Sequence, residues 1–173
     1  MELSKYVACI CEGATEKKIV ELLLDAKKLT FNYEDLLENE VLRCRSADVF
    51  EKRCLRKGFT EKITVLRILD SRRENFKLSK AYADKVKVIN VITAPEIEML
   101  IIFHEGKYEN FKKSHKKPSI YCKEDLGYSE VKSKSFVENY FHNINDLVAA
   151  IIEYKRVSKV QRGEITLADL LIT

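Results

Sequence analysis

Three stretches of the chain are almost continuously apolar and predict strands, the first of them buried on both faces. They are Tyr6–Cys11, Ile63–Leu69 and Val86–Ile92. Short apolar runs of this kind are typical of parallel sheets covered by helices on either side. Residues 41–45 are a weaker candidate for a further strand.

Between these runs the apolar spacing becomes helical. Thr15 begins one such segment, and Ser46 is an expected N-cap. A third helix is expected to start at Pro95, which suits a first helical position. Further helices are predicted at 47–55, 109–113, 119–126, 135–141, 145–158 and 167–171. The alternation of strand and helix predicts an α/β domain over residues 1–105 with a mostly parallel sheet flanked by helices, followed by a helical basic extension over 106–173 packed on it.

Charge and cysteine content change this picture little. The net charge of +4 permits a polyanionic partner without requiring one. Five cysteines are an odd number and lack zinc-knuckle spacing, which indicates reduced thiols in a cytosolic protein. We expect Cys9 and Cys11 on opposite faces of the first strand. Glu2 and Lys5 interrupt any signal-peptide core, and no apolar run is long enough to span a membrane, so a soluble cytoplasmic protein is expected.

Three carboxylates lie where a parallel sheet would bring them together. Glu12 and Asp70 directly follow predicted strands, and Glu98 enters the otherwise apolar segment 97–103 just after another. The carboxyl ends of parallel strands share one edge, where ligands bind in open α/β sheets. Clustered acids hold hard divalent cations such as Mg²⁺, and no phosphate-binding glycine loop is present as an alternative. Simple solvation of Glu12 and a structural ion pair at Glu98 are the competing interpretations.

Two further residues near the three carboxylates in the sequence are expected to have structural roles. Glu16 is expected to be a first-turn helix carboxylate that favours the helix dipole. His104 is expected to be a hydrogen-bonded core histidine.

Three short motifs resemble one family. Cys11-Glu12-Gly13-Ala-Thr-Glu16 after an apolar strand resembles the Glu-Gly signature of the TOPRIM fold, shared by topoisomerases, primases and the OLD and RloB-like phage-defence nucleases. Ile68-Leu-Asp70 resembles the second signature, an apolar strand followed by Asp-x-Asp. Residues 95–104 resemble the Pro-x-x-Glu-Leu-x-x-x-x-His stretch of RloB-like proteins.

This resemblance implies a nuclease that uses Mg²⁺ or Mn²⁺ in defence against phage, with a nucleic-acid substrate and in some relatives a partner ATPase. Glu12 and Asp70 would be catalytic residues and metal ligands, with Glu12 also acting as the general acid or base. The chain departs from the pattern at Arg72, which replaces the second aspartate. Either Glu74 or Glu98 would then complete the metal site.

Arg72 also leaves a second interpretation open. With Arg73 it could clamp a phosphate beside Asp70, which makes Arg72 a candidate catalytic residue. If no acid replaces the missing aspartate, the domain would instead be a degenerate TOPRIM-like subunit that binds nucleic acid or a partner without cleaving.

A basic segment with interleaved aromatic residues follows residue 106. Basic side chains beside tyrosine and phenylalanine suit a phosphate backbone with stacked bases, although charged helix faces are often only solvated. The candidate nucleic-acid-binding lysines are Lys107, Lys112, Lys113, Lys116 and Lys117. The sequence leaves open whether the substrate is DNA or RNA, whether any cleavage is sequence-specific, and which oligomeric state the protein adopts.

Overall fold

Five parallel strands form one sheet at the centre of the protein. In a computed structural model, which describes residues 3–56, 59–70, 76–93 and 96–172, the strand order is β2-β1-β3-β4-β5. The predicted α/β class, a parallel sheet flanked by helices, is confirmed. The strands are β1 (Tyr6–Cys11), β2 (Leu42–Arg43), β3 (Ile63–Leu69), β4 (Val86–Ile92) and β5 (Glu164–Ile165).

The register places the carboxyl ends of the three long strands at one level. Cys11 of β1 lies beside Ile68 of β3, which lies beside Val91 of β4. The segments that leave these strands therefore start side by side at one edge of the sheet. β2 is added to one side of β1, whereas β3, β4 and β5 are added in turn to the other side. The direction in which strands are added therefore reverses between β1 and β3. In open α/β sheets such a reversal point is the preferred ligand site.

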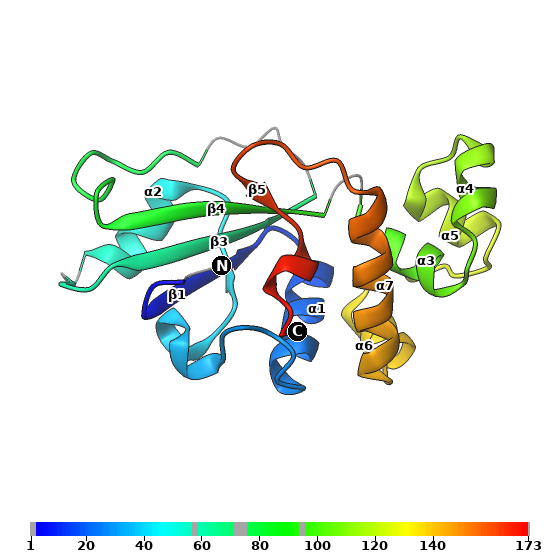
Figure 1. Ribbon diagram of the computed structural model, residues 1–173, viewed down its shortest axis with the longest axis horizontal. Helices are drawn as coiled ribbons and strands as arrows, with labels where there is room; N and C mark the ends of the chain where they lie inside the picture. Colours follow the sequence, from blue (N-terminus) through cyan, green and yellow to red (C-terminus); the bar gives the residue numbers. More distant parts are fainter. Residues whose placement is uncertain (1–2, 57–58, 71–75, 94–95, 173) are drawn as a thin grey trace.

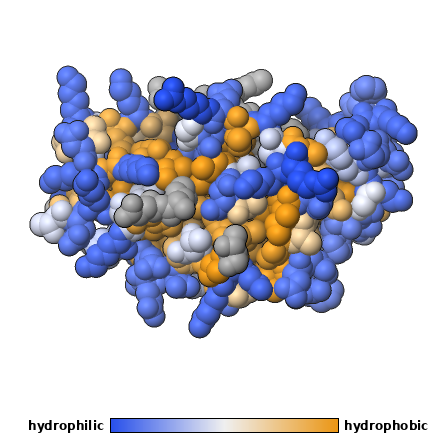
Figure 2. Space-filling model, in the orientation of Figure 1, coloured by the Kyte–Doolittle hydropathy of each residue, from blue (hydrophilic) through white to orange (hydrophobic). Residues whose placement is uncertain are grey.

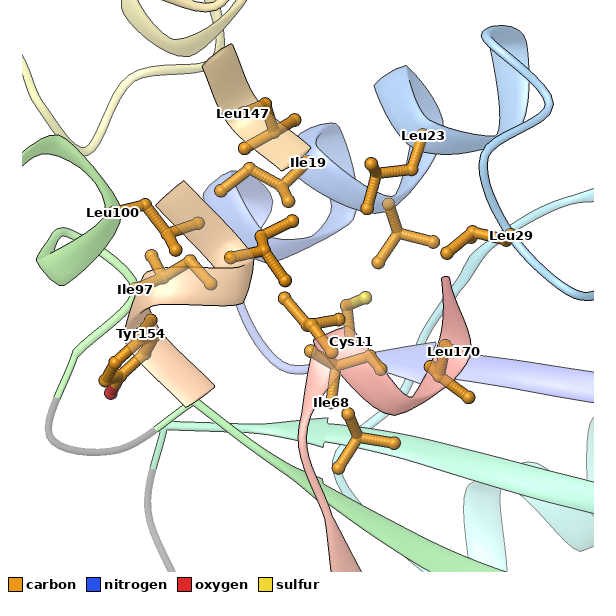
Figure 3. Close-up of a cluster of buried hydrophobic side chains, with 14 of the residues drawn as sticks. Cys11, Ile19, Leu23, Leu29, Ile68, Ile97, Leu100, Leu147, Tyr154 and Leu170 are labelled. Atoms are coloured by element: carbon orange, nitrogen blue, oxygen red, sulfur yellow. The ribbon is translucent and has the colours of Figure 1, made fainter. Parts of the chain in front are cut away.

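Helices cover both faces of the sheet (Figure 1). The larger core lies between the sheet and α1 (Ala14–Asp25), α3 (Met99–His104), α6 (Lys134–Tyr140) and α7 (Ile144–Val157). Figure 3 shows side chains from these elements, among them Ile19, Leu100 and Leu147, meeting Cys11 and Ile68 from the sheet. The smaller core is formed with α2 (Ala47–Phe50), the π-helical turn η3 (Glu51–Leu55) and residues 76–82.

Alternation along β1 decides which side chains enter which core. Val7, Cys9 and Cys11 belong to the larger core, whereas Ala8 and Ile10 belong to the smaller one. The expectation that Cys9 and Cys11 face opposite sides is wrong, because residues two apart in a strand share a face.

Most predicted helices are present, with shifted ends. Ser46 caps α2 as predicted, since its side chain accepts a hydrogen bond from the Val49 backbone, but Val49 itself is exposed. Asn143 caps α7, which begins at Ile144, one residue before the predicted helix. The remaining elements are η1 (Tyr33–Asp35), η2 (Leu37–Asn39), α4 (Tyr108–Ser114), α5 (Pro118–Glu124) and η4 (Leu167–Leu170).

The last segment of the chain returns to the sheet. β5 pairs with β4, and the Ile172 backbone N–H donates to the Lys28 carbonyl at the end of α1. The domain boundary at residue 105 stays a prediction, but the sheet itself takes strands from both sides of it.

The surface is mostly polar. Figure 2 shows polar side chains at both ends of one face and apolar ones gathered over its middle. Within the described residues, no helix has the length and apolar character needed to cross a membrane.

Candidate functional site

Glu16 lies at the carboxyl edge of the sheet because its side chain folds back over Gly13. Gly13 is the N-cap of α1, with an extended backbone that any residue could adopt. A Cβ at this position would overlap the Glu16 carboxylate, so glycine is required here by close approach. Glu16 is only 6% exposed. The expectation of an ordinary first-turn carboxylate therefore missed a buried acid.

Replacing Gly13 by alanine tests this packing. We expect the new methyl group to displace the Glu16 carboxylate, and the poorer N-cap to lower the free energy of unfolding by about 0.5–1 kcal/mol. Urea denaturation measures the stability. A loss of several kcal/mol would contradict the idea that the flexible Glu16 side chain can move aside. The double variant Gly13→Ala/Glu16→Ala, which has no Glu16 carboxylate for the new methyl group to meet, is the control for the change of N-cap alone.

Glu98 is a second buried carboxylate at this edge. It is 5% exposed and immediately precedes α3. The Lys132 ammonium lies 3.8 Å from Glu98 Oε1 and 4.0 Å from Glu96 Oε2. Lys132 is placed there by its backbone, because its carbonyl accepts a 2.9 Å hydrogen bond from the Thr15 hydroxyl of α1. The α1 N-terminus and the loop before α6 thus enclose the Glu98 side chain together.

Burial and neighbouring charges raise the pKa values of Glu16 and Glu98. Burial raises the pKa of Glu16, and the nearby Asp70 raises it further, while Lys132 and Arg43 lower it. Burial also raises the pKa of Glu98, with Glu96 and Glu16 adding to the effect and Lys132 opposing it. We refer to Glu16, Asp70, Glu96 and Glu98 as the acidic cluster.

Asp70 enters the cluster from the end of β3. The preceding Leu69 carbonyl accepts hydrogen bonds from both the backbone N–H (2.7 Å) and the hydroxyl (2.9 Å) of Thr93, which follows β4. The Tyr154 hydroxyl in turn donates to the Thr93 carbonyl at 2.8 Å. The backbone before Asp70 is therefore held firmly. Its carboxylate forms no hydrogen bond or ion pair with another of the described residues.

Glu12 shares the edge with Asp70 but faces a different partner. It continues the alternation of Ala8 and Ile10, which belong to the smaller core. Its Oε1 lies 3.6 Å from the Arg67 guanidinium, and the Arg67 side chain is only 4% exposed. The guanidinium also lies over the Phe76 ring, 4.6 Å from its centre. Glu12 therefore pairs with Arg67, while its predicted meeting with Asp70 and its catalytic role stay predictions.

The donor chemistry of the acidic cluster fits Mg²⁺. Carboxylate oxygens are its preferred protein ligands, and it often binds only one or two of them while keeping several waters. Burial is the main cause of the raised pKa of Glu16 and Glu98, and a divalent cation would offset both this burial and the smaller repulsion between the carboxylates. In the described parts of the chain, no group of three or more His, Cys, Asp or Glu residues is already arranged to hold a metal ion. The predicted ligand Glu74 and the predicted phosphate contacts Arg72 and Arg73 lie outside the described residues.

The predicted nucleic-acid-binding lysines are only partly available. Lys112 pairs with Glu109, and Lys116 pairs with Glu124 and Asp125. Lys107, Lys113 and Lys117 are exposed on α4 and the turns beside it, at one end of the molecule (Figure 1). Carboxylates of the protein itself therefore already compensate two of the five charges. Nucleic-acid contact by the other three stays a prediction.

Sequence reasoning missed the residues that are defined by long-range contacts. Lys132, Arg67 and Arg43 reach the site from the loop before α6 and from β3 and β2. Only Glu16 had a local signal, a glycine three residues before a glutamate at a helix start. His104 is exposed rather than in the core, with its ring against those of Tyr140 and Phe141.

Comparisons with known proteins found no matching family model, curated protein or solved structure. The TOPRIM-like and RloB-like resemblance therefore stays a prediction from the motifs quoted above.

Proposed function

We propose that the protein is a Mg²⁺-dependent nuclease that hydrolyses phosphodiester bonds at the acidic cluster. One observation carries the proposal. Carboxylates from the first turn of α1, the end of β3 and the start of α3 converge at the strand-order reversal of a parallel sheet, where burial and mutual repulsion raise the pKa of two of them. Such an arrangement costs stability unless a cation binds, which makes a purely structural role a poor explanation.

In this proposal Glu16, Asp70 and Glu98 hold the metal ion. Bound Mg²⁺ would supply charge stabilisation on the phosphoryl oxygens during displacement. Lys132, whose charge already acts on Glu16, neutralises the reacting phosphate of the substrate. Glu12 acts as the general acid or base, as the family resemblance implies, and Arg67 fixes the orientation of its carboxylate.

The alternative is a non-catalytic subunit that binds nucleic acid or a partner. Three ion pairs favour it, because Lys132 already faces Glu96 and Glu98, and Arg67 already faces Glu12. In that case these cations would permanently occupy the place of the metal. A role in phage defence and an ATPase partner are proposed from the family resemblance alone.

Metal binding separates the two proposals. We expect calorimetry with MnCl₂ or MgCl₂ to show saturable binding, and Asp70→Asn to weaken it at least about tenfold, since one charged ligand is lost. Asp84→Asn, which neutralises an exposed carboxylate before β4, should bind like the wild type.

Cleavage of labelled single-stranded DNA, duplex DNA and RNA completes the test. Degradation that EDTA abolishes and Asp70→Asn suppresses is the expected result. Saturable metal binding without cleavage of any of these substrates, or cleavage that continues in EDTA, would refute the nuclease proposal. No metal-dependent heat in the wild type would favour the non-catalytic alternative.

A further inference from the structure

A basic hollow lies beside the acidic cluster at the carboxyl end of β2. It is open, has a volume of about 240 Å³ and is lined by Glu12, Arg43, Cys44 and Arg45. Arg43 is the last residue of β2 and pairs in register with Cys11, the residue before Glu12. The hollow therefore occupies the same edge of the sheet as the carboxylates, one strand further out.

The charge of the hollow is positive despite Glu12. Arg43 and Arg45 are both exposed and form no ion pair with a carboxylate among the described residues. The Glu12 carboxylate on the same wall faces the Arg67 guanidinium, which partly cancels its charge. Arg53, which is also exposed and follows on η3, instead contacts both Glu38 and Glu40. The two arginines of the hollow are thus left to interact with an anion from outside.

The other groups of the hollow do not compete for that anion. The Cys44 thiol donates to the Ser46 carbonyl at 3.1 Å, and the Ser46 side chain is used to cap α2. Guanidinium groups present a planar array of donors that matches the oxygens of a phosphate. Arg43 is in register with Cys11 and its charge acts on Glu16, so an anion in the hollow lies at the same end of the sheet as the acidic cluster.

We propose that Arg43 and Arg45 bind a backbone phosphate of the nucleic-acid strand next to the phosphodiester that water hydrolyses at the acidic cluster. The substrate class rests on the proposed nuclease function, whereas the anion site rests on the hollow itself. A nucleic-acid strand fits because its phosphates repeat along the chain, so that one occupies the hollow while its neighbour reaches the carboxylates. The hollow then fixes the register of the strand on the enzyme.

Binding without cleavage tests the site. A fluorescent 20-nucleotide single strand, as DNA and as RNA, is titrated in EDTA at several salt concentrations, and anisotropy gives the affinity. The double variant Arg43→Gln/Arg45→Gln should bind more weakly at each salt concentration. The slope of log affinity against log salt should fall by about 1.4, since each phosphate contact to a single strand contributes roughly 0.7.

A charge-matched control isolates the position from the net charge. Arg56→Gln/Arg162→Gln also removes two exposed guanidinium groups, one before β3 at the opposite edge of the sheet and one before β5. This variant should keep the wild-type slope. Equal slopes in all three proteins, or equal losses in both variants, would overturn the proposal. Stronger competition by poly-glutamate than by unlabelled oligonucleotide would likewise overturn it in favour of an acidic protein partner.

The two proposals can fail separately. If the arginine variant loses binding in EDTA but the wild type never cleaves in Mg²⁺, the phosphate site stands and the nuclease assignment does not. If the wild type cleaves but the arginine variant binds normally, the nuclease stands and the strand follows another path.

Discussion

Replacing Glu16 with glutamine is expected to lower Mg²⁺-dependent cleavage by roughly 10²–10³-fold, because it removes one charged ligand of the metal ion that would stabilise the reacting phosphate. The same change is expected to stabilise the metal-free protein at pH 8. Glu16 is buried beside other carboxylates, so its ionised form is unfavourable in the fold, whereas neutral glutamine keeps the shape without the charge.

The sign of the pH dependence follows from the raised pKa. Between the ordinary pKa of a glutamate and the raised pKa of Glu16, the folded state holds a proton that the unfolded state has lost. The contribution of Glu16 to stability is therefore fully present below the ordinary pKa and is lost as pH rises through the raised one. Glu98 behaves in the same way, while the lowered pKa of Glu105 and Asp169 gives contributions that are lost as pH falls.

Thermal unfolding in EDTA from pH 4 to 8 checks this expectation. The difference between the wild type and Glu16→Gln cancels the other groups, and the variant should gain relative stability as pH rises. Glu130→Gln, an exposed carboxylate in the loop before Lys132, should show no such trend. Wild-type cleavage by Glu16→Gln would remove this residue from the proposed site, and a variant that is less stable at pH 8 would contradict the cost assigned to its charge.

The second large effect is expected at Arg67. Replacing this 4% exposed arginine with methionine keeps the apolar contact with Phe76 but removes the cation that faces Glu12. We expect the free energy of unfolding to fall by about 3 kcal/mol, because breaking one side of a buried ion pair leaves the other charge poorly compensated. Urea denaturation gives the value.

A double-mutant cycle assigns this loss to the ion pair. Adding Glu12→Gln to Arg67→Met should recover part of the stability, because the charge left behind is then removed as well. If the two changes are simply additive, the 3.6 Å contact contributes nothing to the fold and Arg67 acts through packing alone. Such a result would also remove the support for Arg67 as the residue that orients Glu12.

The sequence predicted the parts of the fold that are defined by local pattern. The three long strands are apolar runs whose ends match the structure, and Arg67 did not disturb the prediction because one charge in seven residues leaves the pattern intact. β5 has only two residues in a polar stretch, so nothing local marks it as a strand. It forms because the backbone N–H and C=O groups at the end of β4 pair with those of the segment that lies beside them.

The sequence predicted at which edge of the sheet the candidate site lies, but not which side chains contact one another there. Asp70 and Glu98 could be assigned to one edge because strand ends must meet there. The direction of Glu12 depends on strand alternation and on Arg67, and the position of Lys132 depends on the Thr15–Lys132 contact between α1 and a loop far away in the sequence. These are consequences of tertiary packing, which no short window of residues contains.

The position of β5 also has a consequence for how the chain folds. Asn90 pairs with Glu164 across a long intervening segment, so a large loop must close before this contact forms. Contacts of high sequence separation slow folding, since their entropic cost precedes their reward. We therefore expect β1, β3 and β4 to assemble with α1 first, and the fifth strand to join last, leaving the β4 edge open to other chains during that interval.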